Sequence, residues 1–373
     1  MRTKKLFAVA LVAAMTMGLV ACGQDVTANN NSSSSTSSAP AASEAAPAAS
    51  EAAPAADAAA ASDPTVTMIL GNFCAEGEPG QNASLLFAEK AAEYSGGSVT
   101  VEVHNASELG NAPEMAEQTS LGAIEACMVC EATLDKYDPR YALLPMPYGY
   151  SSYKQAYAVD DGPFREWVQD GKLEESNLHA VNAWDYGFRN LTNSARPVQH
   201  PADVKGLKIR TPQEIQLTAC MEALGADVQQ IVFSELISAL KQKVVDGQEN
   251  PISTIYNNSL WECEQHYLTM TRHQWEAMNL VVNNDWWTGL TDAQREAIEK
   301  AAADAQKSMR EEVSSSENDY IDKLEAEGME VIREIDTKEF QDAMGPAYKQ
   351  LADYVGDASL VDKMNEIIAS VQP

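Results

Sequence analysis

A regular alternation of strand-like and helix-like segments begins near Asp63 and restricts the possible folds more than any other feature. The strand-like segments alternate apolar and polar side chains, and the helix-like segments place their apolar residues on one face. In chain order they are a strand at 65–71, a helix at 81–94, a strand at 98–104, a helix at 113–121 and a strand at 124–129. Because a helix between consecutive strands favours parallel pairing, this order predicts an α/β fold in which helices cover a parallel sheet.

The rest of the chain continues with further strands and ends in helices. The expected segments are an apolar crossing at 141–147, helices at 152–159 and 164–175, a strand at 178–184, a helix between Pro251 and residue 260, strands at 267–270 and 277–283, and helices at 337–355 and 359–371. Thr291 and Gln294 form a capping box that opens a long helix to about residue 327, with the serines at 314–316 as a candidate kink. At 1.5 Å per residue this helix would be ~54 Å long, which exceeds the diameter of one domain.

The N-terminus is typical of an export signal. Three basic residues precede an apolar run from Leu6 to Val20, which is too short for an ordinary membrane span. The run ends in Leu-Val-Ala and is followed by Cys22, an order that resembles a bacterial lipobox. We therefore expect residues 1–21 to be a lipoprotein signal peptide and Cys22 to receive the lipid, which would anchor the protein to the cell membrane on its outer side. An ordinary signal peptide with cleavage nearby is the alternative.

Residues 22–62 are predicted to form a disordered tether. They consist mainly of Ser, Asn, Ala and Pro, and the sequence AASEAAP at 41–47 is repeated at 48–54. With almost no large apolar side chain, this segment cannot offset the entropy lost on ordering. Its expected root-mean-square reach is roughly 35 Å, which suits a protein that is anchored to a membrane but acts beyond its surface.

Composition excludes one broad class of function. The 373 residues carry a formal net charge of −29, whereas binding to a phosphate backbone requires a basic surface. The length is sufficient for one large domain or two medium ones with real cores. An anionic ligand would have to be held by local arginines against an unfavourable overall field.

Arg210 is the first candidate for such an anion site. It ends a short alternating segment at 206–210, and Thr211-Pro212-Gln213-Glu214 has the pattern of a capping box that opens a helix. A guanidinium at the carboxyl end of a strand, beside a helix N-terminus, can hold a carboxylate through two parallel hydrogen bonds. The alternative is an arginine paired with a neighbouring Asp or Glu.

Arg189 and Asn250 are two further candidates in the same stretch. Arg189 follows an aromatic strand, and its alternative role is an ion pair with an acid such as Asp185. Asn250 lies in an extended segment after a turn predicted at Asp246-Gly247, and its amide can both donate to and accept from a ligand. Its alternative role is to satisfy the backbone of a loop.

Five cysteines remain after Cys22, and they do not form a paired pattern. Cys127 and Cys130 have the spacing of a redox or zinc motif, but residues three apart on a strand point to opposite faces and cannot clamp a metal. We expect free thiols, although one disulfide is possible.

Three long segments carry a resemblance to a known family. GFRNLTNSARPVQHPADVKGLKIRTP from Gly187, LGADVQQIVFSELISALKQKVVDGQENP from Leu224 and WECEQHYLTMTRH from Trp261 resemble the core of extracytoplasmic solute-binding proteins of tripartite ATP-independent periplasmic (TRAP) transporters, the dicarboxylate-binding DctP-like family. The similarity runs from about Thr65 to the end and is weaker outside Gly187 to His273. It implies a two-lobed periplasmic-binding-protein-like α/β fold with a long helix that spans both lobes.

The resemblance also implies roles for individual residues. Arg210, in the K-I-R segment, would be the main carboxylate anchor, with Arg189 and Asn250 as further ligand contacts. The positions that would complete the site are Phe233, which would pack on the ligand, and Asn72 and Glu131, which would line the cleft from the first lobe. The family often has an acid soon after a Leu-Gly pair, whereas Leu109-Gly110 is followed here by Asn111. This difference leaves the sugar-acid specificity of the family open for this chain.

The resemblance predicts that the chain crosses between the lobes more than once. Lobe I would comprise residues 63–186 and about 276–315, and lobe II would comprise residues 187–275 and about 316–373. The implied function is high-affinity capture of a small organic acid and its delivery to a TRAP-type permease, with no cofactor, no metal and no enzymatic activity. A ligand-sensing lipoprotein that feeds a signalling partner is the main alternative. An extracellular enzyme is a further alternative, although neither a G-x-S-x-G nor an H-E-x-x-H motif occurs.

Overall fold

The computed structural model describes residues 63–372. These residues belong to one compact unit of the chain, Ala59–Pro373, and the other unit, Met1–Ala58, lies outside the described range. The expected signal peptide, the lipidation site Cys22 and the tether at 22–62 therefore also lie outside the described residues. Between residues 63 and 372, no helix combines the length and the apolar character that a membrane span requires.

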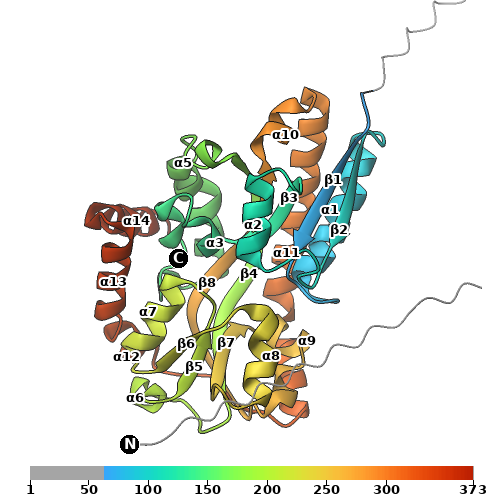
Figure 1. Ribbon diagram of the computed structural model, residues 1–373. Coiled ribbons are helices and arrows are strands. Elements are labelled where there is room, and N and C mark those ends of the chain that lie inside the picture. Colours follow the sequence, from blue (N-terminus) through green and yellow to red (C-terminus); the bar gives the residue numbers. More distant parts are fainter. Residues whose placement is uncertain (1–62, 373) are drawn as a thin grey trace, which may run out of the picture. The chain divides into compact units, whose positions relative to one another are not determined.

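The strands form one mixed sheet (Figure 1). Its order is β2-β1-β3-β8-β4-β7-β5-β6, with β9 paired to β8. The strands are β1 Val66–Asn72, β2 Val99–His104, β3 Ala126–Cys130, β4 Leu178–Asn193, β5 Lys208–Thr211, β6 Asp227–Gln230, β7 Gly247–Pro251, β8 Tyr267–Asn283 and β9 Glu330–Ile332. The expected parallel pairing is found within β1–β3 and within β5–β7. The long strands β4 and β8 pair antiparallel with each other and join the two groups.

Helices cover both ends of this sheet. Figure 1 shows α1 and α2 beside β1–β3, and α7 and α8 beside β5–β7. The helices are α1 Pro79–Tyr94, α2 Ala112–Ser120, α3 Glu131–Leu134, α4 Tyr153–Val159, α5 Arg165–Val168, α6 Pro201–Val204, α7 Ile215–Ala223, α8 Phe233–Lys241, α9 Ile252–Asn257, α10 Asn284–Gly289, α11 Asp292–Ala326, α12 Thr337–Asp342, α13 Gly345–Val355 and α14 Ala358–Ser370. Short 3-10 or π turns occur at Pro139–Ala142, Asp160–Phe164, Glu174–Ser176 and Leu260–Cys263.

The crossings between the two groups of strands are continuous, unlike the separate short strands predicted from the sequence. The strand expected to end at residue 184 runs on to Asn193, and the two strands expected at 267–270 and 277–283 are a single strand, β8. Polar residues in the middle of both strands hid this continuity, because they are buried rather than exposed. Gly187 lets β4 pass through a bulge with a φ of 105°, a conformation that side-chain-bearing residues rarely adopt.

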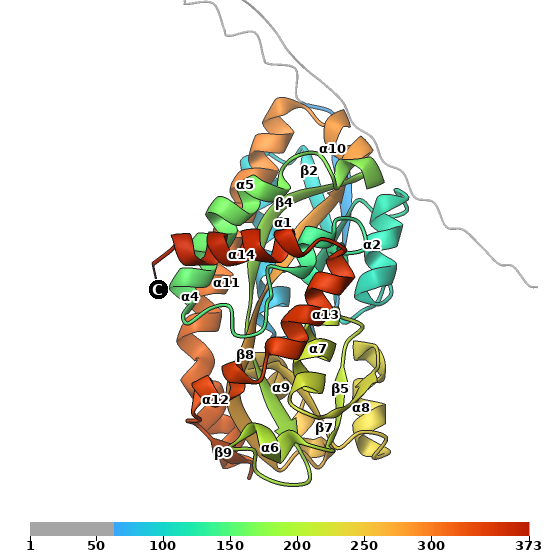
Figure 2. The ribbon, with the colours of Figure 1, turned by 90° about the vertical axis from the view of Figure 1, so that its left-hand side faces the viewer.

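The long helix is confirmed, together with its capping box at Thr291 and Gln294. α11 runs alongside both groups of strands in Figure 2. Its residues Ile298 and Met309 belong to one hydrophobic cluster and Tyr320 belongs to another. The candidate kink at residues 314–316 does not split the helix, although the hydroxyls of Ser314 and Ser315 donate to backbone carbonyls one turn earlier, a bond that often bends helices.

Two expected helices are broken in the structure. The pattern at 164–175 is helical only as far as Val168, because Gly162 and Pro163 disturb its start and Gly171 adopts a φ of 87°. The pattern at 337–355 consists of two helices, α12 and α13, with a break before Gly345. Glycine interrupts the helix only in the first segment; in the second the break lies at Ala343 and Met344, and Gly345 is the first residue of α13.

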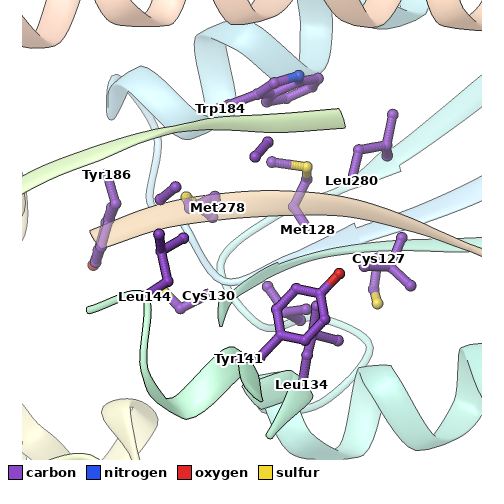
Figure 3. Packing of buried hydrophobic residues seen from close by; sticks show 14 of the residues in the cluster. Cys127, Met128, Cys130, Leu134, Tyr141, Leu144, Trp184, Tyr186, Met278 and Leu280 are labelled. Atoms are coloured by element: carbon purple, nitrogen blue, oxygen red, sulfur yellow. The ribbon is translucent and has the colours of Figure 1, made fainter. Parts of the chain in front are cut away.

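Buried apolar side chains form three clusters. The first surrounds β1, β3, the N-terminal half of β4 and the C-terminal half of β8. The other two flank β5–β7. Figure 3 shows Trp184 on one side of β8 and Tyr141 and Leu134 on the other, so the sheet is covered on both faces there. The indole N–H of Trp184 donates to the carbonyl of Ala302 at 3.1 Å and so ties β4 to α11. The described cysteines, 74, 127, 130, 220 and 263, are all buried and free, as expected.

The fold is therefore two-lobed, with β4, β8 and α11 shared between the lobes. The predicted lobe boundaries stay predictions. Val361 and Met364 of α14 lie in the first cluster, together with β1 and β3, whereas we expected residues 316–373 to belong to lobe II.

Candidate functional site

A pocket lies between the two groups of strands and encloses about 680 Å³ of space, its open mouth included. The lining residues are Phe73, Ser107, Asn111, Ala112, Pro113, Cys130 and Thr133 from the first group, and Tyr186, Arg189, Arg210, Pro212, Gln213, Glu214, Val232, Phe233 and Asn250 from β4 and the second group. Four of the six ligand-binding residues predicted from the sequence are among them.

Arg210 reaches the pocket from the end of β5 and is almost completely buried, with 1% of its surface exposed. Its Nε donates to the carbonyl of Ile231 at 2.8 Å, but its Nη2 is buried without any acceptor. Within residues 63–372 the guanidinium forms no ion pair, so the alternative role of pairing with a neighbouring acid is not observed. Burial lowers the pKa of Arg210 to about 10, which leaves it charged at neutral pH.

A buried guanidinium that has no counter-ion and leaves one nitrogen, Nη2, without an acceptor is unusual and energetically costly. The Arg210 guanidinium lines the pocket, and the Phe233 ring lies 5.9 Å from its central carbon. A carboxylate placed there would supply both the missing charge and the missing acceptors.

Arg189 lines the same pocket but is already paired. Its Nε donates to Glu249 Oε2 at 2.5 Å, its Nη1 donates to Glu276 Oε2 at 2.7 Å, and its Nη2 also reaches Asn250 Oδ1 at 3.1 Å. The expected alternative, an ion pair, is therefore present, but its partners are Glu249 and Glu276 rather than Asp185. Asp185 instead accepts from the Tyr157 hydroxyl and the Trp275 indole.

The partners of Arg189 titrate differently. Burial opposes ionisation of both carboxyls, but Arg189 and the hydrogen bond from His273 hold the pKa of Glu249 below its usual value. Burial raises the pKa of Glu276, although Arg189 opposes this shift. Of the two carboxyls, Glu249 therefore has the stronger tendency to be ionised.

Asn250 lines the pocket at the end of β7. Its Oδ1 accepts from Arg189, and its Nδ2 donates to Gln248 Oε1. An amide nitrogen carries two hydrogens, so Asn250 keeps one donor for a ligand. The turn predicted at residues 246–247 is instead the start of β7, where a Cβ on Gly247 would come within 2.2 Å of the Thr192 carbonyl oxygen.

Asn72 and Glu131 are not brought to the pocket. Asn72 donates to the Ser84 hydroxyl at 3.2 Å and accepts from the backbone N–H of Cys74 at 2.9 Å. Glu131 accepts at 2.9 Å from the backbone of Ala277 and at 2.9 Å from the side chain of Asn279. Both side chains are thus already engaged, Asn72 by residues that follow β1 and Glu131 by β8.

Glu214 is the most informative residue that the sequence reasoning missed. The Thr211-x-x-Glu214 pattern predicts a capping box, but Thr211 continues β5 and pairs with Gln230, and α7 begins only at Ile215. The prediction of a capping box is therefore wrong. Glu214 occupies the N-cap position of α7, but its side chain makes no capping hydrogen bond. It lines the pocket instead, where its Oε2 is buried without a partner.

Other lining residues gave weaker signals in the sequence. Asn111, noted as a difference from the family pattern, lines the pocket and caps α2 by accepting from the backbone N–H of Glu114 at 3.0 Å. Phe73 and Tyr186 pack edge to face at 5.6 Å between ring centroids and form an apolar wall. Among residues 63–372, no group of His, Cys, Asp and Glu side chains is placed to hold a metal ion.

Comparison with known proteins identifies the family. Residues 70–353 match the family described as bacterial extracellular solute-binding protein, family 7, also called DctP. The chain belongs to this family. Its members bind solutes for transport, so the DctP-type solute-binding function predicted from the sequence is confirmed at this level.

Several relatives cover most of the chain. The 2,3-diketo-L-gulonate-binding periplasmic protein of Escherichia coli is 29% identical over 287 residues, which is 76% of this chain and 87% of the relative. A solute-binding protein of Roseobacter denitrificans is 31% identical over 284 residues, 76% of this chain and 86% of the relative. An uncharacterised protein of Sinorhizobium fredii is 36% identical over 240 residues, but this chain covers only 44% of it.

Solved structures of DctP-type proteins show the same fold. The sugar acid binding protein of Advenella mimigardefordensis in complex with galactonate has a TM-score of 0.78 and 28% identity, with 83% of this chain and 100% of that chain covered. A TRAP periplasmic solute binding protein from Polaromonas bound to D-erythronate has a TM-score of 0.77 and 25% identity, with 82% and 99% covered.

Proposed function

We propose that this protein captures a small organic acid between its two lobes, with Arg210 as the anchor of the ligand carboxylate. The observation that carries this proposal is the buried guanidinium of Arg210, whose Nη2 lacks an acceptor at the wall of the pocket. A bound carboxylate would neutralise the charge and accept two N–H groups, as arginine and carboxylate commonly pair.

The other lining residues would complete the site in different ways. Arg189 is held by Glu249 and Glu276, so its contribution is mainly positional, through a fixed orientation of Asn250. Asn250 would donate its remaining N–H to the ligand, and Phe233 would pack against it. Arg210 thus supplies the charge recognition, while Arg189 holds the neighbouring amide.

We further propose that the captured acid passes to a TRAP-type membrane permease and that a lipid on Cys22 holds the protein at the outer side of the cell membrane. Support for delivery comes from the family and from the TRAP solute-binding proteins with the same fold. Support for the anchor comes from the small residues before Cys22 and from the Ser-, Ala- and Pro-rich segment at 22–62. A tether of this composition would let the lobes reach a permease in the same membrane.

Thermal unfolding tests the capture of an acid. The purified protein would be heated with D-galactonate, D-erythronate, D-glucuronate, pantoate and succinate in turn. A ligand at 100 times its dissociation constant should stabilise the protein by about 2.7 kcal/mol, which raises the unfolding midpoint by a few degrees. We expect Arg210→Ala to abolish this rise.

Arg333→Ala is the matched control, because it removes the same charge from an exposed pair with Asp322 and Glu325. It should leave the ligand response unchanged. The unfolding midpoint of each ligand-free variant shows whether Arg210→Ala is folded, and Arg210→Lys tests the geometry separately, since lysine keeps the charge but loses the two parallel hydrogen bonds. An equal response in wild type and Arg210→Ala would refute the role of Arg210.

A further inference from the structure

Arg210 and Glu214 have side chains of opposite charge and line the same pocket, yet each keeps an unsatisfied polar atom. They lie four residues apart, Arg210 near the end of β5 and Glu214 just before α7. Arg210 Nη2 and Glu214 Oε2 are both buried without a hydrogen-bond partner. A buried polar atom that makes no hydrogen bond is costly, and here a donor and an acceptor in one pocket wall both lack a partner.

A ligand with two opposite charges matches these two groups. Its carboxylate would accept from Arg210, and an ammonium group close to the carboxylate would donate to Glu214 Oε2. Both bonds would be charge-assisted, and such bonds are roughly twice as strong as those between neutral groups. A zwitterion also has no net charge, so the formal charge of −29 on the protein does not oppose its approach.

The charges around Glu214 favour a cation beside it. Glu276 and Glu249 both add negative charge near its carboxyl, whereas Arg189 adds a positive charge. Burial and the charge of Glu276 raise the pKa of Glu214, and a ligand ammonium beside it would oppose this shift and favour the ionised form. A second ligand carboxylate at the same place would instead be repelled.

The rest of the pocket suits an apolar group. Its charged lining residues are Arg189, Arg210 and Glu214, and Arg189 is already shared by two glutamates. Beside them the Phe73 ring lies 5.6 Å from the ring of Tyr186 and 6.1 Å from the ring of Phe233, measured between centroids. A ligand side chain that packs on these rings gains affinity from apolar contact and needs no charge of its own.

We propose that the pocket binds an α-amino acid with an apolar side chain, and that Glu214 is a specificity-determining residue that accepts a hydrogen bond from the ammonium group of this ligand. Arg210 holds the carboxylate on the same carbon atom, and the aromatic wall contacts the side chain. The inference rests on the proposed capture of an acid by Arg210 and narrows its ligand class to zwitterions.

The first test changes the ligand and leaves the protein intact. Valine, leucine and phenylalanine, in both enantiomers, would each be compared by calorimetry at pH 7 with two acids of the same carbon skeleton. One acid carries a hydroxyl in place of the ammonium group, and the other carries a hydrogen. We expect at least one amino acid to bind wild type about tenfold or more tightly than its hydroxy acid, with the plain acid weaker still.

The second test changes the protein. Glu214→Gln keeps the size of the side chain but removes its charge, so it should weaken the amino acid about tenfold and the hydroxy acid by a smaller factor. The preference for the amino acid should then fall to about threefold or less. Glu235→Gln, on the exposed surface of α8, is the matched control and should keep the full preference. The unfolding midpoint of each ligand-free variant shows whether it is folded.

The outcomes separate this inference from the proposed function. A hydroxy acid or plain acid that binds wild type as tightly as its amino acid would overturn the role of Glu214. Equal losses for amino acid and hydroxy acid in Glu214→Gln would also overturn it, because they would indicate a structural effect on the pocket. If sugar acids or succinate bind through Arg210 and no amino acid binds, the inference fails and the proposed function stands. If no acid of either kind binds wild type, both fail.

Discussion

Arg189 and Arg210 reach the same pocket from β4 and β5, but only Arg189 has carboxylate partners. Glu249 and Glu276 hold the first guanidinium, whereas Nη2 of the second is buried without an acceptor. Two arginines of equal charge and similar burial therefore have different surroundings, and we propose different tasks for them: Arg189 stabilises the free protein, and Arg210 captures the ligand.

This difference predicts that replacing Arg189 destabilises the protein much more than replacing Arg210. Arg189→Ala should lower the free energy of unfolding by about 3–5 kcal/mol, because it leaves two buried carboxylates without their partner. Arg210→Met should change it by less than about 1 kcal/mol, or raise it, because it removes a buried charge that has no counter-ion. Urea denaturation of the ligand-free variants measures both. Equal losses would show that Arg210 has a structural partner in solution.

Glu78 predicts a dependence of stability on pH. It is buried before α1 and accepts from Asn258 Nδ2 at 2.6 Å, and burial raises its pKa from 4.5 to about 7. Between these values the folded protein keeps a proton that the unfolded chain releases, so the free energy of unfolding falls as the pH rises from 4.5 to 7. At about 1.4 kcal/mol per pKa unit the fall is roughly 3 kcal/mol.

The Glu78 contribution is measured as a difference between variants, because Asp185 also has a pKa raised by burial to about 7. Denaturation of wild type and Glu78→Gln at pH 5 and pH 8 should show a smaller loss in the variant by about 3 kcal/mol. Glu89→Gln, at an exposed side chain, should behave as wild type. Parallel pH curves for wild type and Glu78→Gln would contradict the prediction.

Gly247 is predicted to be irreplaceable for a steric reason. A Cβ there would lie 2.2 Å from the Thr192 carbonyl oxygen of the adjacent strand, and backbone cannot yield as a side chain can. Gly247→Ala should cost about 3 kcal/mol or more, measured by thermal unfolding. Gly345→Ala is the matched control: no atom lies within 4 Å of its added Cβ, and alanine favours the helix, so its effect should be neutral or stabilising. A mild effect of Gly247→Ala would mean that β4 and β7 can separate locally.

Cys22 predicts where the protein is found in the cell. If its thiol is lipidated, the protein should sediment with membranes, and Cys22→Ala should move it to the soluble extracytoplasmic fraction, because two or more acyl chains anchor durably. Cell fractionation followed by immunoblotting measures this. Retention of Cys22→Ala on the membrane would indicate another anchor.

Local patterns were sufficient for the elements whose side chains interact mainly with near neighbours. The β1-α1-β2 beginning and the capped helix α11 follow from hydrophobic periodicity and from the Thr291 box. Periodicity failed in β4 and β8, because it equates burial with apolar residues. Buried polar residues there, such as Asn190 and Glu276, bond to partners that are distant in sequence.

By itself, the sequence determined the class of fold, the family and the presence of Arg210 at the carboxyl end of a strand. Only the tertiary structure decided that Arg189 is neutralised by Glu249 and Glu276 while Arg210 is left free, and that the Glu214 side chain lines the pocket without making a capping hydrogen bond. The physical reason is that pairing and protonation of buried charges depend on groups brought together from separate strands, and no local pattern records which of them will meet.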